Sequence, residues 1–113
     1  MIKRPGVLLL LFSLAMTFSF PAFADDAIWI DVRTPQEFGE GHVDQAVNIP
    51  YDEIGARIAS VTADQDATIY VYCRSGRRSG MAKATLDEMG YTRVVNIGGL
   101  EDALEKAGQP SDH

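Results

Sequence analysis

Short apolar runs alternate with amphipathic segments along the chain from residue 27 onward. Four of these runs are rich in β-branched or aromatic residues and predict strands at 27–32, 46–49, 68–72 and 92–97. Helical patterns follow them and predict helices at about 35–40, 52–60, 79–89 and 100–107. Because a helix can provide the crossover between two parallel strands, this alternation predicts an α/β domain with a central, mainly parallel sheet flanked by helices.

Local signals sharpen some of these boundaries. Thr34 is a predicted N-cap, Pro35 fits the first helical position, and Glu37 completes a capping box. Gly98 and Gly99 predict a turn after the last strand. The helix at 79–89, which Gly90 should end, has an expected buried face made of Met81, Ala82, Leu86 and Met89.

Residues 1–24 match the pattern of a cleaved secretory signal. Lys3 and Arg4 form a positive start, an apolar run of 14 residues covers 7–20, and Ala22-Phe23-Ala24 gives a small-x-small cleavage pattern. The run would reach roughly 21 Å as a helix, which is shorter than a hydrocarbon core of about 30 Å and disfavours a transmembrane anchor. We therefore expect cleavage after Ala24, export to the periplasm, and no membrane attachment of the mature protein.

The remaining residues, 25–113, have the size of one small domain. Removing Lys3 and Arg4 leaves 8 of the 10 basic residues against all 16 acidic ones, so the net charge changes from -6 to -8. This acidity argues against a nucleic-acid binder. One cysteine and two histidines are too few for an intramolecular disulfide or a metal cage, so no metal or cofactor is expected. We expect a monomer with a disordered tail at 108–113.

The single cysteine, Cys73, follows the strongest strand pattern directly and precedes a predicted helix. Backbone N–H groups at a helix N-terminus favour an anion, and the small Ser75 and Gly76 suit a tight loop around one. Three basic residues fall close together in this otherwise acidic chain, namely Arg74, Arg77 and Arg78. Cations at a helix N-terminus oppose the helix dipole, so this cluster indicates an anionic ligand.

A sulfur at the rim of such an anion cradle should ionise easily. Lowering a thiol pKa by about two units takes roughly 2.7 kcal/mol, whereas a helix terminus supplies about 0.3 to 1 kcal/mol. Hydrogen bonds from loop N–H groups, at about 1.5 to 3 kcal/mol each, can supply the remainder. The alternative is an inert, buried Cys73, which the strand-to-helix position and the arginines disfavour. His42 is assigned a turn or packing role, and His113 lies in the tail, so protease-type catalysis is weakly supported.

An ordered set of motifs along the whole of residues 25–113 resembles the single-domain rhodaneses, which are thiosulfate sulfurtransferases. The motifs are Trp29-Ile30-Asp31-Val32-Arg33, Glu37-Phe38, Gly41-His42-Val43, Ala46-Val47-Asn48-Ile49-Pro50, Val71-Tyr72-Cys73, Gly76-Arg77, Ser79-Gly80, Glu88-Met89-Gly90-Tyr91 and Gly98-Gly99-Leu100. The resemblance implies that Cys73 takes a sulfane sulfur from thiosulfate as a persulfide. The acceptor would then be cyanide or a thiol, including a thiol of another protein.

The same resemblance implies roles for the residues around Cys73. Asp31 and Arg33 match a family Asp-x-Arg motif and are expected to be structural charges that support the loop region. One departure is Gln45, where the family usually has glycine, so the entry to the second strand could differ. The expected substrate-binding residues are Arg74, Ser75, Gly76, Arg77, Arg78 and Ser79.

Loop length distinguishes this chain from related phosphatases, which place five residues between cysteine and arginine to enclose a phosphate. Here Ser79 stands after five residues and Arg78 after four, as in the shorter rhodanese loop. Two alternatives stay open. One is a phosphatase or arsenate reductase that uses the same cradle for an oxyanion, and the other is a rhodanese-like binding module without catalysis.

Overall fold

Four parallel strands form the centre of the computed structural model, which describes residues 26–111. The predicted signal segment 1–24 lies outside the described residues. The strands have the spatial order β2-β1-β3-β4 and the bounds β1 (Ile28–Asp31), β2 (Val47–Asn48), β3 (Thr68–Cys73) and β4 (Arg93–Gly99). The predicted α/β fold with a parallel sheet is therefore confirmed.

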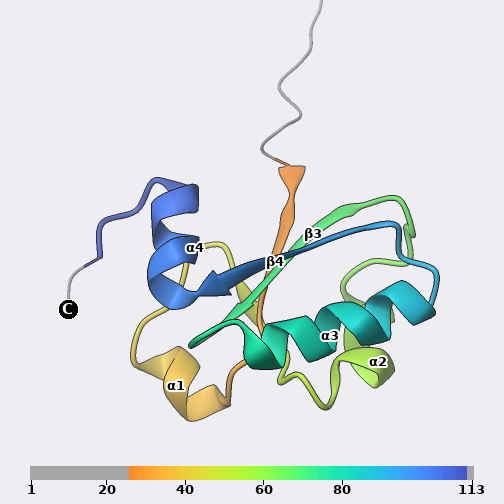
Figure 1. Ribbon diagram of the computed structural model, residues 1–113, viewed down its shortest axis with the longest axis horizontal. Helices are drawn as coiled ribbons and strands as arrows, with labels where there is room; N and C mark the ends of the chain where they lie inside the picture. The colour runs from red at the N-terminus through yellow and green to blue at the C-terminus, as the bar shows by residue number, and fades with distance from the viewer. Residues whose placement is uncertain (1–25, 112–113) are drawn as a thin grey trace, which may run out of the picture.

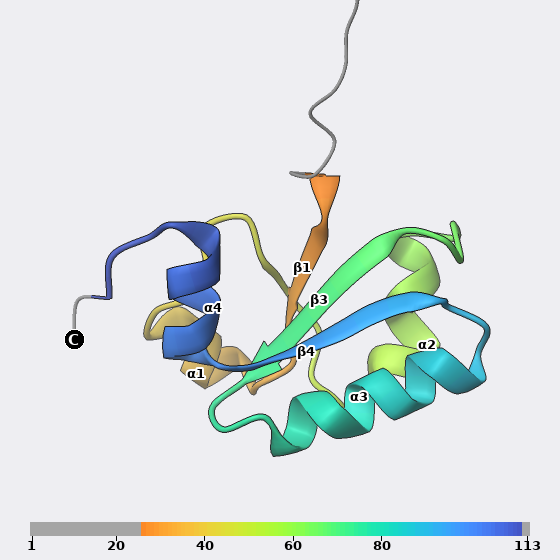
Figure 2. The same cartoon turned by 45° about the horizontal axis from the view of Figure 1, so that its top comes forward.

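Helices cover both faces of this sheet, as Figures 1 and 2 show. They are α1 (Pro35–Gly39), α2 (Ile54–Arg57) continued by the 3-10 turn η3 (Ile58–Ser60), α3 (Arg77–Glu88) and α4 (Leu100–Ala107). The capping box predicted at the first helix is present, because Glu37 N donates to Thr34 Oγ1 at 3.1 Å and Thr34 N donates to Glu37 Oε1 at 3.1 Å.

Alternation along the strands divides the core into two clusters. On β3, Ile69, Val71 and Cys73 pack with residues of α2 and α3 on one face of the sheet. Tyr72 points to the opposite face, where Ala103 and Leu104 of α4 cover the sheet. This period of two is the reason that Cys73 ends β3 on the side of the sheet where α3 begins.

Three helix predictions are wrong in detail. Helix α3 begins at Arg77 rather than near Ser79, because arginine is a good helix former and only Gly76 stops the pattern. Met81 of that helix and its C-cap residue Met89 are 47% and 40% exposed, since Ser79, Ala82 and Leu86 take the buried side of the helix. The helix predicted at 52–60 is shorter and tightens into a 3-10 turn, with no side-chain cap at its start and the weak helix former Gly55 inside it.

The junction between β4 and α4 also differs from the prediction. Gly98 and Gly99 belong to β4 rather than to a turn, and the pairing of β3 with β4 shifts register after Val71. Beyond α4, the main chain of Gly108 caps the helix, and Gln109 Oε1 accepts a hydrogen bond from Asp44 N at 2.9 Å. The disorder expected for 108–113 stays a prediction, and residues 112–113 lie outside the described part of the chain.

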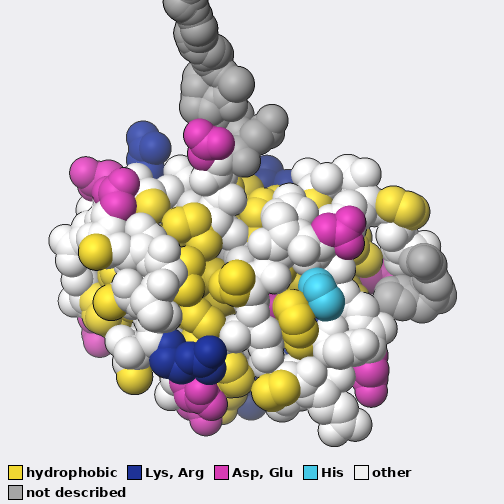
Figure 3. All heavy atoms as spheres, turned by 180° about the vertical axis from the view of Figure 1, so that it is seen from behind, with side chains coloured by type: hydrophobic (Ala, Val, Ile, Leu, Met, Phe, Trp, Pro, Cys, Tyr) yellow, Lys and Arg dark blue, Asp and Glu magenta, His cyan; other side chains and the backbone are white. Residues whose placement is uncertain are grey.

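The surface carries charged groups around scattered apolar ones. Seen from behind, hydrophobic side chains gather near the middle of the face, and charged side chains lie mainly towards its edges (Figure 3).

Gln45 is exposed in the turn before β2, and β2 forms without the glycine that is usual in the family the sequence resembles. Within residues 26–111, none of the helices has the length and apolar character needed to cross a bilayer.

A buried ion pair closes the carboxyl end of β1. Asp31 is 0% exposed and Arg33 is 3% exposed, and Arg33 Nη2 lies 2.6 Å from Asp31 Oδ2. Arg33 Nη2 also donates to the Gly41 carbonyl at 2.7 Å, while Asn48 Nδ2 donates to the main-chain oxygens of Asp31 and Arg33, both at 3.0 Å. The pair therefore joins the end of β1 to the segment after α1.

We expect Asp31→Ala to lower the free energy of unfolding by about 3 to 5 kcal/mol, because it leaves the Arg33 charge buried without a partner. Urea unfolding followed by circular dichroism measures the change. The control is Glu53→Ala, which breaks an exposed pair with Arg57 (2.7 Å) and should cost less than about 0.5 kcal/mol. Equal costs for the two variants would contradict a structural role for the buried pair.

Candidate active site

The sulfur of Cys73 lies where β3 ends and the loop before α3 begins. Only Arg74, Ser75 and Gly76 separate β3 from the first residue of α3, Arg77. Gly76 has φ +98°, a conformation that L side chains rarely adopt, and so it allows the chain to turn directly into the helix. This tight connection aims the first N–H groups of α3 back at the sulfur.

Three polar groups lie within hydrogen-bond distance of Cys73 Sγ. Gly76 N donates to Sγ at 3.0 Å, Ser79 N donates at 3.4 Å, and Ser79 Oγ lies 3.4 Å from the sulfur. Cys73 is 1% exposed and Ser79 is 0% exposed, so water contributes little to solvation of the sulfur. A negative sulfur at this position is therefore stabilised mainly by groups of the protein itself.

The balance of these effects makes Cys73 acidic. Burial raises the pKa of the thiol, but hydrogen bonds from the Ser79 hydroxyl and from the N–H groups of Ser79, Ser75 and Gly76 outweigh it. The pKa falls from its ordinary value of 9.0 to about 7. The hydrogen-bond donors therefore outweigh the cost of burying the charged sulfur. A large fraction of Cys73 is consequently thiolate near neutral pH, which is the nucleophilic form.

Glu37 of α1 compensates two of the loop arginines. Arg74 Nε donates to Glu37 Oε2 at 3.0 Å, and Arg78 donates to both carboxylate oxygens at 2.8 and 3.1 Å. The hydrogen bond from Arg78 and those from Thr34 and Arg74 hold the pKa of the Glu37 carboxyl well below its usual range, against the opposing effect of burial. Arg74 and Arg78 thus have an internal anion, which the sequence reasoning missed because it gave Glu37 only a capping role.

Arg74, Ser75 and Arg77 are the three exposed members of the predicted set, and of the two exposed arginines only Arg74 pairs with Glu37. Within residues 26–111, no carboxylate forms a salt bridge with Arg77, whose Nη1 lies 3.8 Å from Met81 Sδ. Arg77 is therefore the loop arginine whose positive charge is least compensated by the protein.

Asn96 is a site residue that the sequence reasoning missed. Its Nδ2 donates to the Gly76 carbonyl at 3.0 Å, and its Oδ1 accepts from Ser79 Oγ at 2.7 Å and from Gly98 N at 3.0 Å. An asparagine inside a predicted strand was the available signal, because asparagine is depleted in strands. The loop, the first turn of α3 and the end of β4 are joined through this one side chain.

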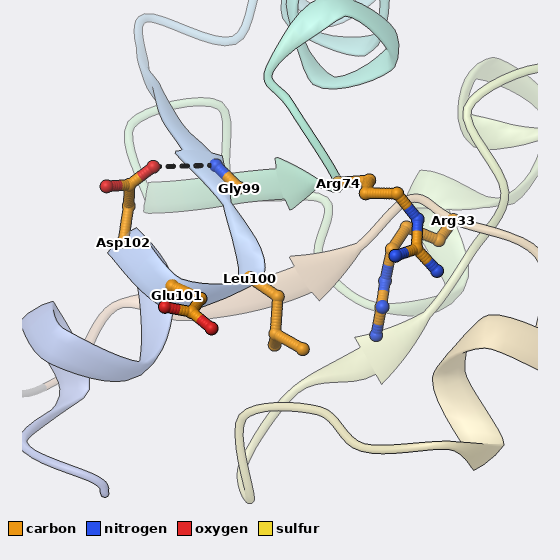
Figure 4. A pocket seen from close by; sticks show the side chains of 6 residues that line it. All are labelled: Arg33, Arg74, Gly99, Leu100, Glu101 and Asp102. Carbon is orange, nitrogen blue, oxygen red and sulfur yellow. Dashed lines mark hydrogen bonds between the residues drawn. The ribbon is translucent and has the colours of Figure 1, made fainter. Parts of the chain in front are cut away.

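A cavity of about 460 Å³ opens beside the loop, lined by Arg33, Arg74, Gly99, Leu100, Glu101 and Asp102. Arg33 and Arg74 lie together on one side of it, and Glu101 and Asp102 lie on the other (Figure 4). A Cβ atom at Gly99 would collide with the Arg74 carbonyl oxygen, so only glycine lets β4 pass this close to the loop. Arg33, which pairs with the buried Asp31, lines this cavity together with Arg74.

His42 has the packing role expected from the sequence. Its Nδ1 donates to the Phe38 carbonyl at 2.7 Å, and its ring stacks on the Phe38 ring with centroids 3.6 Å apart. Among residues 26–111, histidine, cysteine, aspartate and glutamate side chains nowhere gather in a group of three or more that could hold a metal ion. The chemistry available at this site is that of one thiolate and its hydrogen-bond donors.

Comparison with protein families gives a match to the rhodanese-like domain over residues 22–106. The chain is 51% identical over 92 residues to thiosulfate sulfurtransferase PspE of Escherichia coli strain K12, covering 81% of this chain and 88% of that protein. It is 37% identical over 89 residues to a sulfurtransferase of Allochromatium vinosum, covering 79% of this chain and 81% of the relative.

Among solved structures, the fold is similar to that of a rhodanese with anions from E. coli. The TM-score is 0.65 at 51% identity, over 67% of this chain and 89% of the other. The present chain therefore shares its fold with a solved rhodanese to which it is 51% identical.

We expect Ser79→Ala to raise the pKa of Cys73 by about one unit, because the hydroxyl that donates to the thiolate is lost while the N–H donors remain. The pH dependence of alkylation by iodoacetamide, which reacts with the thiolate, measures this pKa. Ser75→Ala is the matched control, since its exposed hydroxyl makes no hydrogen bond to the sulfur. An unchanged midpoint in Ser79→Ala would show that the hydroxyl does not stabilise the thiolate.

Proposed function

The chain belongs to the rhodanese-like domain family and is a sulfurtransferase, and we propose that it moves a sulfane sulfur from thiosulfate through Cys73 to cyanide or a thiol. The observation that carries this proposal is the donor set on Cys73 Sγ, formed by Gly76 N at 3.0 Å and by Ser79 N and Oγ at 3.4 Å. It makes the thiolate available near neutral pH, and the relative at 51% identity is a thiosulfate sulfurtransferase.

In the first step, the Cys73 thiolate attacks the outer sulfur of thiosulfate. The bond from that sulfur to the sulfonate sulfur breaks, and its electron pair leaves with sulfite. Cys73 becomes an anionic persulfide, so one thiolate and one dianion give one persulfide anion and one dianion. No proton is transferred, which explains why donors of hydrogen bonds suffice and a histidine base is unnecessary.

In the second step, an acceptor nucleophile attacks the terminal sulfur of the persulfide. Cyanide is converted to thiocyanate, and a thiolate acceptor becomes a new persulfide. The S–S bond of the Cys73 persulfide breaks, and its electron pair stays on Sγ, so that Cys73 becomes a thiolate again. Gly76 N–H and the Ser79 groups stabilise the returning charge, because they already point at Sγ. The cycle needs no cofactor, and the acceptor supplies the second thiol.

Oxyanion hydrolysis is supported less well by the loop. A phosphatase of this type uses the arginine that closes the loop to hold the phosphate, whereas Arg78 stands one residue too early and both its Nη groups bind Glu37. Hydrolysis of an aryl phosphate that disappears in Cys73→Ser would nevertheless favour that class. Normal function of Cys73→Ala in cells would favour a binding module instead.

We expect incubation with thiosulfate to add the mass of one sulfur atom to the protein and cyanide to release it as thiocyanate. A reductant should also remove the added sulfur, and Cys73→Ser should show neither reaction, because it has no thiolate. Intact-protein mass spectrometry and a thiocyanate assay measure the two steps. A wild-type protein that gains no removable sulfur and forms no thiocyanate would refute the proposed reaction.

The loop arginines differ in their proposed contribution to donor binding. Arg74 and Arg78 hold the loop through Glu37, whereas Arg77 presents its charge to solvent beside the cradle. Arg77 should therefore attract the thiosulfate dianion most directly.

Arg77→Ala should raise the KM for thiosulfate roughly three- to five-fold and weaken its salt dependence, in keeping with the loss of an exposed charge interaction. Steady-state kinetics at low and high salt test this. The control is Lys83→Ala, which also removes a cation from α3. The Lys83 ammonium group pairs with Asp87 at 2.8 Å. Similar KM changes in both variants would mean that only the overall charge matters.

The proposal also includes export of the protein to the periplasm. It is supported by the positive start, the apolar run and the Ala22-Phe23-Ala24 pattern within residues 1–24. An exported enzyme would meet its donor and acceptor, including any thiol protein, outside the cytoplasm.

The mature protein should begin at Asp25, as determined by N-terminal sequencing of protein recovered from the periplasm of an expressing Gram-negative cell. Ala24→Leu should slow cleavage, because the cleavage site requires a small residue. Recovery of the uncleaved chain from the cytoplasm alone would rule out export.

A further inference from the structure

Asn96 lies on β4, outside the cysteine loop, but both polar atoms of its side chain form hydrogen bonds around the site. Oδ1 accepts from Ser79 Oγ at 2.7 Å and from Gly98 N at 3.0 Å, and Nδ2 donates to the Gly76 carbonyl at 3.0 Å. The residue is exposed, and asparagine is disfavoured in strands. Neither core packing nor strand formation therefore explains its presence.

The Ser79 hydroxyl has one proton and two neighbouring acceptors. Cys73 Sγ lies 3.4 Å from Ser79 Oγ, whereas Asn96 Oδ1 lies at 2.7 Å. When Cys73 is a thiol, its S–H can donate to Ser79 Oγ while the hydroxyl donates to Asn96, so all three groups are satisfied. When Cys73 is a thiolate, it can only accept, and the hydroxyl must turn away from Asn96 to donate to the sulfur.

We propose that Asn96 is a positioning residue for sulfur transfer, which competes with Cys73 for the Ser79 hydroxyl proton and so favours the resting thiol over the thiolate. The inference deepens the proposed function and rests on it for its role in turnover. Between turnovers, this competition would limit the amount of thiolate, which is the form that oxidants attack. When a sulfur donor arrives, rotation of one hydroxyl suffices to release the restraint.

A purely structural role for Asn96 has the opposite consequence. If Asn96 only held the loop through the Gly76 carbonyl and Gly98 N–H, its loss would loosen the loop and weaken the Gly76 N–H bond to the sulfur (3.0 Å). The thiolate would then lose a donor, and the pKa of Cys73 would rise. The direction of the change therefore separates the two roles.

The test is the pH dependence of iodoacetamide alkylation of Cys73 in Asn96→Ala. We expect the pKa of Cys73 to fall by roughly half a unit to one unit, as suits the loss of one competing neutral hydrogen bond. The same change in a Ser79→Ala background should have little effect, because no hydroxyl is left to orient. Val95→Ala, which alters an exposed neighbour on β4 without changing charge, should leave the pKa unchanged.

The proposal would be overturned if the pKa of Cys73 rose in Asn96→Ala. It would also be overturned if Asn96→Ala shifted that pKa equally with Ser79 present and in the Ser79→Ala background. Thermal melting shows whether each variant is folded, and Asn96→Ser, whose side chain is too short to replace the amide contacts, carries the same test if Asn96→Ala folds poorly. Alkylation needs no sulfur donor. Failure of this inference can therefore be distinguished from failure of the sulfur-transfer reaction, which the persulfide mass tests separately.

Discussion

Burying a thiolate costs free energy that only well-aimed hydrogen-bond donors can offset, and the active site is arranged around this requirement. Cys73 is 1% exposed, so the Gly76 and Ser79 groups take the place of water. They can do so only because Gly76 adopts φ +98° and brings the first turn of α3 against the end of β3. The end of β3, Gly76 and the start of α3 together place the N–H donors that stabilise the buried sulfur.

The charges around the cysteine loop are partly offset within the protein. Arg74 and Arg78 would oppose the dipole at the start of α3, but both bind Glu37, which also caps α1 through Thr34. One carboxylate therefore fixes a helix start and two loop arginines at once. Because Glu37 offsets one of these two positive charges and holds both guanidinium groups, the acidity of Cys73 depends mainly on short-range hydrogen bonds, and Arg77 keeps its charge exposed to solvent.

Support from outside the loop comes from both neighbouring strands. The Asp31–Arg33 pair closes the end of β1 in the core, and Arg33 reaches the same cavity wall as Arg74. On the other side, Gly99 lets β4 approach the Arg74 carbonyl, and Asn96 connects β4 to Gly76 and Ser79. A loop this short has little rigidity of its own, so precise placement of its hydrogen-bond donors must come from such contacts.

Local periodicity and propensity account for the alternation of strands and helices, the capping box at Thr34 and the position of Cys73 between a strand and a helix. The local pattern did not reveal that Met81 and Met89 face solvent, or that Gly98 and Gly99 continue β4. Nor did it reveal Glu37 and Asn96 as partners of the loop. The contacts of Glu37 and Asn96 with the loop join residues 17 to 41 positions apart, which only packing of the helices and β4 against the end of β3 brings together.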